Sequence, residues 1–297
     1  MSIAATVRTW GEMIKFSHSI FALPFAVFAM MLAGRTLPGG LPAWGQVGLI
    51  VLCMVAARGF AMTFNRIADA AIDARNPRTA NRPIPAGRIT SAQAWAFTIA
   101  SAAIFMAACG GFLRYANRWP LTLAVPVLLL LACYSYAKRF TAAAHLVLGV
   151  AIGFAPLAAW IAINPATLDG SAVMLSGAVA LWIAGFDLIY ACQDIEVDRR
   201  EGLFSVPARF GAGTALTLSR VCHATTIGLL VGVGRVEHLG VFYFAGVGAA
   251  TILLIVEQSL VRANDLSRVN LAFFTVNGVV SVIFAICGVA DVLGSRP

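Results

Sequence analysis

Residues 58–88 read RGFAMTFNRIADAAIDARNPRTANRPIPAGR, and the organisation of the chain follows from this stretch. It begins inside an apolar segment and ends in a basic loop, with Asn65, Asp69 and Asp73 four residues apart at the boundary. Carboxylates at the edge of a membrane are costly unless they are paired or bind a metal ion. Their placement here therefore indicates a chemical role.

A second acidic stretch, DLIYACQDIEVDRREG, begins at Asp187 and also closes an apolar segment. When Asp194 is aligned with Asp69, Asp198 falls on Asp73, and five of the eight aspartates of the chain lie in these two stretches. One such pair alone is typical of a solvated helix end. Two matched pairs, each followed by arginines, favour a site for a divalent metal and a polyanion.

The composition indicates an integral membrane protein. Of the 297 residues, 60% are hydrophobic and only 11% are charged, and the mean hydropathy is +0.86. Soluble domains carry about a quarter charged residues. The net charge of +8 does not indicate a nucleic-acid-binding protein, because the basic residues are spread over short loops between apolar runs.

Apolar runs of about 20 residues predict membrane-spanning helices. Nine are expected, at about 16–34, 46–70, 93–113, 119–137, 142–163, 172–193, 212–233, 239–261 and 269–291. We expect an all-α polytopic membrane protein with one domain over 1–297, in which nine helices surround a central cavity. The matched acidic stretches suggest two four-helix units plus one extra helix.

Loop charge predicts the orientation. With the N-terminus inside, 13 Lys and Arg residues lie in inner segments and 5 in outer segments, which favours a cytoplasmic N-terminus. Both acidic motifs (65–73 and 187–198) and the basic loops that follow them (74–92 and 199–211) then lie on the cytoplasmic side. We expect the protein in the inner (plasma) membrane, with its site opening to the cytoplasm.

Other polar and small residues are expected to be structural. The six cysteines lie in predicted spans without a CxxC motif, which predicts packing residues rather than disulfides or a zinc site. We expect His145 and His223 to make helix contacts, and Glu257 to pair or to extend toward the interface. Small residues at 149–153 and 246–250 predict close helix packing.

Periodicity places each acidic set on one face of its helix. Asp187, Asp194 and Asp198 share a face, as do Arg58, Asn65 and Asp69. If the two helices face one cavity, the carboxylates repel one another, and Mg²⁺ shared with substrate phosphates would relieve that repulsion. The sequence contains neither ordinary nucleotide-binding loop.

These motifs, in order NRIADAAID, ARNPRTANRPIPAG, YSYAKRFT and FDLIYACQDIEVDRREG, resemble the UbiA superfamily of intramembrane prenyltransferases. The resemblance covers nearly the whole chain. It implies Mg²⁺-dependent transfer of a polyprenyl group from its diphosphate to an aromatic ring. Arg66 stands where many members carry an aspartate, so one potential metal ligand is missing.

The resemblance implies a role for each motif residue. Asp69, Asp73, Asp194 and Asp198 would bind the metal, and Asp187 or Asp194 would accept a proton. The expected diphosphate ligands are Asn65, Arg66, Arg82, Lys138 and Arg139. Apolar and aromatic walls that shelter an allylic cation are expected from Phe64, Tyr134, Phe186 and Tyr190.

The acceptor is expected to be a small aromatic acid. Arg58 either packs between helices or pairs with the acceptor carboxylate. Tyr190 is also expected to bind the aromatic acceptor. The stretch MIKFSHSIFALPFA, with Lys15 and His18, resembles the 4-hydroxybenzoate polyprenyltransferase-like subgroup. This favours 4-hydroxybenzoate, in ubiquinone or menaquinone biosynthesis. A dihydroxynaphthoate on the futalosine route to menaquinone is the alternative.

Three other classes fit less well. A transporter requires charges spread through mid-span positions, whereas the acids here gather at one level. A CDP-alcohol phosphotransferase carries its aspartates on a single stretch, and a soluble prenyl synthase lacks this hydropathy. We expect prenyl diphosphate, the aromatic acid and the bilayer as partners, with neither nucleic acid nor an obligate protein partner.

Overall fold

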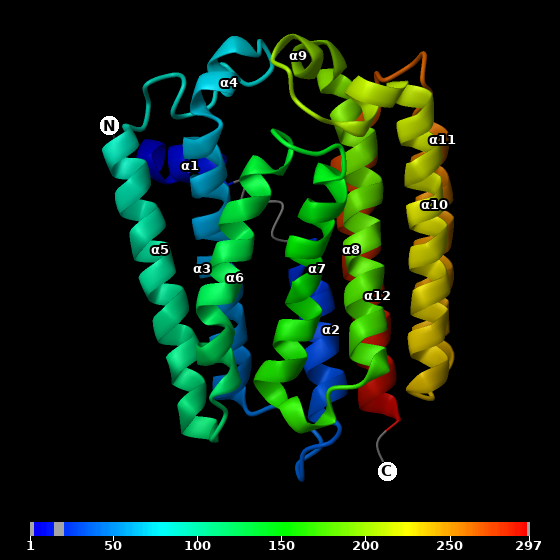
Figure 1. Ribbon diagram of the computed structural model, residues 1–297. Helices are drawn as coiled ribbons and strands as arrows, with labels where there is room; N and C mark the ends of the chain where they lie inside the picture. Colours follow the sequence, from blue (N-terminus) through cyan, green and yellow to red (C-terminus); the bar gives the residue numbers. More distant parts are fainter. Residues whose placement is uncertain (1–2, 15–20, 296–297) are drawn as a thin grey trace. The chain divides into compact units, whose positions relative to one another are not determined.

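The computed structural model describes residues 3–14 and 21–295, and every regular element within these ranges is a helix (Figure 1). The long helices are α1 (Ile3–Ile14), α2 (Leu23–Gly34), α3 (Trp44–Ala68), α5 (Ser91–Gly111), α6 (Trp119–Ala137), α7 (Ala144–Ile163), α8 (Gly170–Ala191), α10 (Val206–Val236), α11 (Val241–Leu260) and α12 (Asn277–Gly294). The short ones are α4 (Ala70–Arg75), η2 (Phe112–Tyr115), η3 (Pro165–Thr167), η4 (Cys192–Asp194), α9 (Ile195–Arg200) and the π-helix η5 (Leu271–Val276). The all-α prediction is confirmed.

Eight helices in the described ranges are long and apolar enough to cross a membrane. They correspond to the second to ninth predicted spans. The first predicted span, 16–34, is represented by the 12-residue α2, and its earlier part, with Lys15 and His18, lies outside the described residues. The predicted count of nine spans is therefore not confirmed, whereas the prediction of a polytopic membrane protein is confirmed.

The chain divides into two compact units. Unit 1 comprises Met1–Ser19 and Gly48–Tyr136, and unit 2 comprises Ile20–Val47 and Ala137–Pro297. The first acidic motif belongs to unit 1 and the second to unit 2. Each motif is therefore built by the packing of its own unit.

In unit 1, the described part of α1 is held against the basic loop and α5. Trp10 of α1 stacks on Phe97 of α5 with ring centroids 4.6 Å apart, and Met13 joins a buried cluster that contains Ile89. Arg88 Nη1 donates to Glu12 Oε2 at 2.7 Å, and this bond holds the pKa of the Glu12 carboxyl below its usual value. One end of the loop that follows the first motif is thus anchored.

In unit 2, α8 packs against both α7 and α10 (Figure 1). Its buried face is almost wholly apolar and includes Leu175, Val179 and Ile183. Because α8 ends at the second acidic motif, these contacts fix the position of that motif. The helix is the centre of unit 2.

The contact between α7 and α8 depends on two glycines. A Cβ atom on Gly149 would lie 2.2 Å from the carbonyl oxygen of Ala180, and one on Gly153 would lie 2.7 Å from the Ala180 Cβ. The backbones therefore approach without an intervening layer of side chains. This confirms the expected close packing at 149–153.

Replacing Gly149 by alanine is expected to destabilise the protein by about 1–3 kcal/mol, because the added methyl overpacks a backbone contact. Thermal unfolding of purified protein in detergent measures the loss. Gly228→Ala is the control, since Gly228 is exposed on α10 with nothing within 4 Å of its Cβ position. An unfolding midpoint of Gly149→Ala equal to that of Gly228→Ala would contradict the close contact.

Candidate functional site

The first acidic motif lies where α3 breaks. Asp69 separates α3 from the six-residue α4 with φ −96° and ψ 4°, outside the helical range. The amides of Asp69 and Asp73 still donate to the carbonyls of Asn65 and Asp69, at 2.9 and 2.8 Å. The two aspartates therefore lie one turn apart across the break, and they are only 2% and 4% exposed.

Both aspartates of this motif have side-chain partners in unit 1. Asn65 Nδ2 donates to Asp69 Oδ2 at 3.3 Å, and Arg82 Nη1 lies 2.7 Å from both carboxylate oxygens of Asp73. Arg82 was predicted to hold diphosphate; the structure pairs it with Asp73. The ion pair joins residues nine positions apart and thereby holds the start of the basic loop against the first acidic motif.

A buried arginine accompanies the aspartates. Arg66 is 5% exposed and interacts electrostatically with Asp73 and Asp69. Among the described residues its Nε finds no hydrogen-bond acceptor. Such a buried guanidinium N–H fits an anionic ligand.

Arg58 lies two turns earlier on α3 and is half-buried. It interacts electrostatically with Tyr134 of α6, as Arg66 does. The Tyr134 hydroxyl donates to the carbonyl oxygen of Ala61 at 3.4 Å. Unit 1 thus brings together Arg58, Arg66 and Tyr134 beside the first motif.

The second motif repeats the helix break. Helix α8 ends at Ala191, the turn η4 follows, and Asp194 precedes the six-residue α9 with φ −106° and ψ 8°. These angles are within about 10° of those at Asp69. Asp198 then has the same place in α9 as Asp73 has in α4.

Partners in unit 2 hold Asp198. The Ser205 hydroxyl donates to Asp198 Oδ2 at 2.6 Å, and its oxygen also accepts from the Ala208 amide at the start of α10. Asp198 interacts electrostatically with Asp194 and with Lys138. The Lys138 carbonyl accepts from the Phe204 amide at 2.6 Å, which joins the α6–α7 connection to the loop 199–211. Arg139 follows Lys138 in that connection.

His145 is the partner of Asp187, which the sequence did not indicate. His145 Nδ1 lies 2.7 Å from Asp187 Oδ2, and the Val206 amide donates to its Nε2 at 3.3 Å. Because Nε2 accepts, the proton of the neutral ring lies on Nδ1 and points to Asp187. The prediction of a helix-contact histidine omitted this bond; only the joint placement of α7, α8 and α10 reveals it.

Aromatic rings flank the second motif. Phe186 and Tyr190, which lie one turn apart on α8, both contact Phe273 of η5, at centroid distances of 5.1 and 4.2 Å. In unit 1, Phe64 contacts Trp95 and Tyr136 edge to face. The predicted aromatic residues thus fall into two sets, one in each unit.

Metal-binding capacity follows from the donors. In the described residues, no three His, Cys, Asp or Glu side chains form a group that holds a metal by itself. Each motif offers two aspartates, whose oxygens suit Mg²⁺, an ion that usually retains water and takes phosphate ligands. The donor set therefore fits a metal shared with a phosphorylated substrate.

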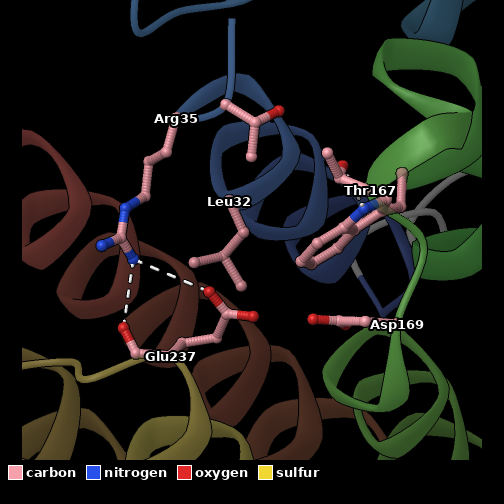
Figure 2. Close-up of a pocket in the computed structure, with 7 residues that line it drawn as sticks. Leu32, Arg35, Thr167, Asp169 and Glu237 are labelled. Carbon is pink, nitrogen blue, oxygen red and sulfur yellow. Dashed lines mark hydrogen bonds and ion pairs between the residues drawn. The ribbon is translucent and has the colours of Figure 1, made fainter.

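The cavity in Figure 2 lies elsewhere in unit 2. It has a volume of about 310 Å³ and is lined by residues that include Arg35, Asp169 and Glu237. Arg35 Nη1 lies 3.3 Å from the Glu237 carbonyl oxygen and 3.8 Å from its carboxylate. Asp169 and Asp194 flank opposite ends of α8, which is about 33 Å long at 1.5 Å per residue. This cavity is separate from the acidic motif of unit 2.

Comparison with known proteins decides the family. Residues 22–279 match the model of the UbiA prenyltransferase family. The chain belongs to the UbiA prenyltransferase family. It is therefore a membrane-embedded prenyltransferase, as the motifs indicated.

Similar proteins cover nearly the whole chain. A 4-hydroxybenzoate octaprenyltransferase of Vibrio parahaemolyticus is 29% identical over 95% of this chain and 97% of its own length. A 4-hydroxybenzoate solanesyltransferase of Synechocystis sp. is 32% identical over 78% and 76%. The apo structure of a UbiA homologue from Aeropyrum pernix has a TM-score of 0.77 with 29% identity, covering 93% of this chain and 97% of that one.

A more distant fold relative was solved with ligands. The UbiA homologue from Archaeoglobus fulgidus, bound to DMAPP and Mg²⁺, has a TM-score of 0.70 with 17% identity and covers 97% of this chain and all of its own. This likeness shows that the fold is shared. The prenyltransferase architecture of this chain thus has solved counterparts with the same fold.

Replacing His145 by alanine is expected to lower kcat for prenyl transfer about 10- to 100-fold, the usual effect of losing a partner that orients a functional side chain. His145→Asn retains an amide donor for Asp187 and is expected to keep more activity. His238→Asn is the control, since His238 is exposed at a positive φ that asparagine tolerates. Equal kcat values in folded His145→Ala and wild type would show that the bond has no role.

Proposed function

We propose that this chain transfers a polyprenyl group from its diphosphate to an aromatic acid, with 4-hydroxybenzoate as acceptor, in quinone biosynthesis. One observation carries the proposal: the same helix break occurs twice, with an aspartate at the break and another one turn on. The names of the relatives support the acceptor. The units 1 and 2 act together as one prenyltransferase domain over 1–297.

Mg²⁺ is the metal that fits the carboxylate donors. Asp69, Asp73, Asp194 and Asp198 would hold it together with the diphosphate. When bound, the metal neutralises charge on the diphosphate and makes it a better leaving group. The Mg²⁺-bound homologue supports this assignment.

Basic side chains hold the diphosphate as it departs. Arg66 presents a buried Nε that finds no acceptor among the described residues, and Lys138 lies within electrostatic range of Asp198. Guanidinium and ammonium groups bind phosphate oxygens with charge-assisted hydrogen bonds. Arg82 reaches the diphosphate by exchanging a bond to Asp73, and Arg139 and Asn65 complete the set.

Proton removal falls to Asp187. Its Oδ2 accepts from His145, which leaves Oδ1 to accept the phenol proton of the acceptor. The allylic carbon–oxygen bond breaks with its electron pair on the diphosphate, a carbon–carbon bond forms to the ring, and one proton leaves overall. Arg58 binds the acceptor carboxylate, and Tyr190 contacts the acceptor ring.

The location follows from loop charge. We place the protein in the inner (plasma) membrane with a cytoplasmic N-terminus, because 13 of the loop Lys and Arg residues then lie inside and 5 outside. Both acidic motifs open to the cytoplasm in this orientation. A dihydroxynaphthoate, the menaquinone precursor, is the alternative acceptor.

Asp69→Asn and Asp194→Asn are each expected to lower kcat at least about 100-fold, because each removes a carboxylate that would hold the Mg²⁺ on which the departing diphosphate depends. Chelation of divalent metal with EDTA is expected to abolish activity, and Mg²⁺ to restore it. Asp265→Asn, in the exposed loop after α11, is the control. Folded Asp69→Asn and Asp194→Asn proteins with wild-type rates would rule out the metal scheme.

Arg58→Gln is expected to raise KM for 4-hydroxybenzoate by more than about tenfold, since a charged hydrogen bond contributes 1.5–3 kcal/mol. KM for farnesyl diphosphate should stay unchanged. Offering 4-hydroxybenzoate, 1,4-dihydroxy-2-naphthoate and 1,4-dihydroxy-6-naphthoate in parallel, and measuring the mass of the product, identifies the acceptor. If none of the three acceptors gives a product, the quinone assignment is contradicted. If Arg58→Gln leaves KM for the acceptor unchanged, Arg58 packs between helices and does not bind the acceptor.

A further inference from the structure

A chain of polar side chains crosses the buried interior of unit 2. Trp182 Nε1 of α8 donates to Asn277 Oδ1 at 2.7 Å, and Asn277 Nδ2 donates to Glu257 Oε1 of α11 at 2.8 Å. All three residues are at most 1% exposed. Glu257 therefore pairs inside the unit, which confirms the first of its two expected roles, and it does not extend toward the interface.

Asn277 also fastens the π-helix that precedes it. Its Nδ2 lies 3.1 Å from the carbonyl oxygen of Ala272 and 3.3 Å from that of Phe273, both within η5. A π-turn shifts backbone hydrogen bonds out of the regular α-helical pattern, and each backbone group inside a membrane must find a partner within the protein. The asparagine amide supplies that partner.

The turn in η5 sets the position of Phe273. Its ring packs on Tyr190 at 4.2 Å and edge to face on Phe186 at 5.1 Å. In the sequence of α8, Phe186 comes directly before Asp187 and Tyr190 comes three residues after it. Tyr190 in turn precedes Asp194 by one turn. Phe273 is thus the third ring of a cluster beside the second acidic motif.

The other end of the polar chain fixes α8 as well. Glu257 Oε2 lies 3.9 Å from His223 Nδ1 of α10, and Gln258 Nε2 lies 3.0 Å from the same nitrogen. A Cβ atom on Gly185 would come within 2.5 Å of the His223 ring. The network therefore contacts α8 at Trp182 and, through His223, at Gly185, immediately before Phe186 and Asp187.

We propose that Asn277 is a positioning residue for prenyl transfer. By closing η5 it holds Phe273 against Tyr190 and Phe186, so that the three rings form a fixed wall beside Asp187 and Asp194. This wall keeps water from the allylic carbon while the aromatic acceptor attacks it. The role assigned to the wall rests on the proposed function, whereas the attachment of η5 to Asn277 does not.

A purely structural origin explains the network less well. Burying an amide and a carboxyl group costs free energy unless both are hydrogen-bonded, and carboxyl groups within membrane spans are rare and costly. Apolar residues at 257 and 277 would pack α11 on α12 without that cost, but they would remove the side-chain donor that Asn277 gives to the carbonyls of Ala272 and Phe273. π-turns are found frequently at functional sites, where they redirect one side chain.

The test measures how farnesyl diphosphate is partitioned between prenylated acceptor and hydrolysed farnesol. In Asn277→Leu and Phe273→Leu the hydrolysed fraction is expected to rise about tenfold, because displacing one wall admits water. Phe284→Leu is the matched control: it also removes a buried ring of unit 2, but one that packs on Phe25 and Phe28. It should lower the unfolding midpoint without changing the partition.

Conservative substitution separates positioning from stability. Glu257→Gln keeps an oxygen that accepts from Asn277 and should retain the wild-type partition, whereas Glu257→Leu should behave as Asn277→Leu does. The double variant Asn277→Leu/Phe273→Leu should hydrolyse no larger fraction of farnesyl diphosphate than either single variant, since both substitutions disrupt the same aromatic wall. Additive effects would contradict a shared role.

Hydrogen exchange of the amides in 271–277 gives a readout that needs no acceptor. Asn277→Leu should exchange there at least about tenfold faster than wild type, and Phe284→Leu should not. If wild type prenylates none of the acceptors, the proposed function fails, and exchange together with the rate of diphosphate hydrolysis still decides the role of Asn277. A folded Asn277→Leu with wild-type exchange and partition overturns the inference.

If Asn277→Leu does not fold, Asn277→Asp decides by the same two measurements, because it keeps the acceptor for Trp182 and loses the donor to η5.

Discussion

A polypeptide inside a bilayer must satisfy its own backbone hydrogen bonds, and this constraint governs where the chain places its polar chemistry. Both acidic motifs lie at the end of a spanning helix, where a single residue leaves helical geometry and a short helix resumes. At Asp69 the ladder of amide bonds continues through the break. Carboxylates can therefore gather there without exposing backbone groups to lipid.

The sequence predicted the features that depend on local pattern. Apolar runs located the spanning helices, and the spacing of Asp69 and Asp73 placed both on one side of a helix end, because helical periodicity fixes neighbours three or four residues apart. For the residues between the helices, the sequence predicted only that they form loops and not which side chains they pair with. The pairing of Arg82 with Asp73 depends on how the eight intervening residues turn, and propensity does not specify that path.

Contacts between helices distant in sequence could not be predicted. The bond of His145 to Asp187 joins residues 42 apart, and that of Trp182 to Asn277 joins residues 95 apart. Each is determined by helix packing, and a lone histidine or asparagine in an apolar span gives no sign of its partner. Glu257 was expected either to pair or to extend toward the interface, and its position near a helix end did not decide between the two, because tertiary packing places Asn277 beside it.

The glycine contact between α7 and α8 has a mechanical consequence. Close-packed interiors have low compressibility and transmit strain, and two backbones in direct contact have no layer of side chains between them. At Gly149 and Gly153 a shift of α7 is therefore expected to be transmitted directly to α8. His145 on α7 and Asp187 on α8 belong to this closely packed pair, so we expect donor and acceptor to shift together and their hydrogen bond to be retained when the helices move.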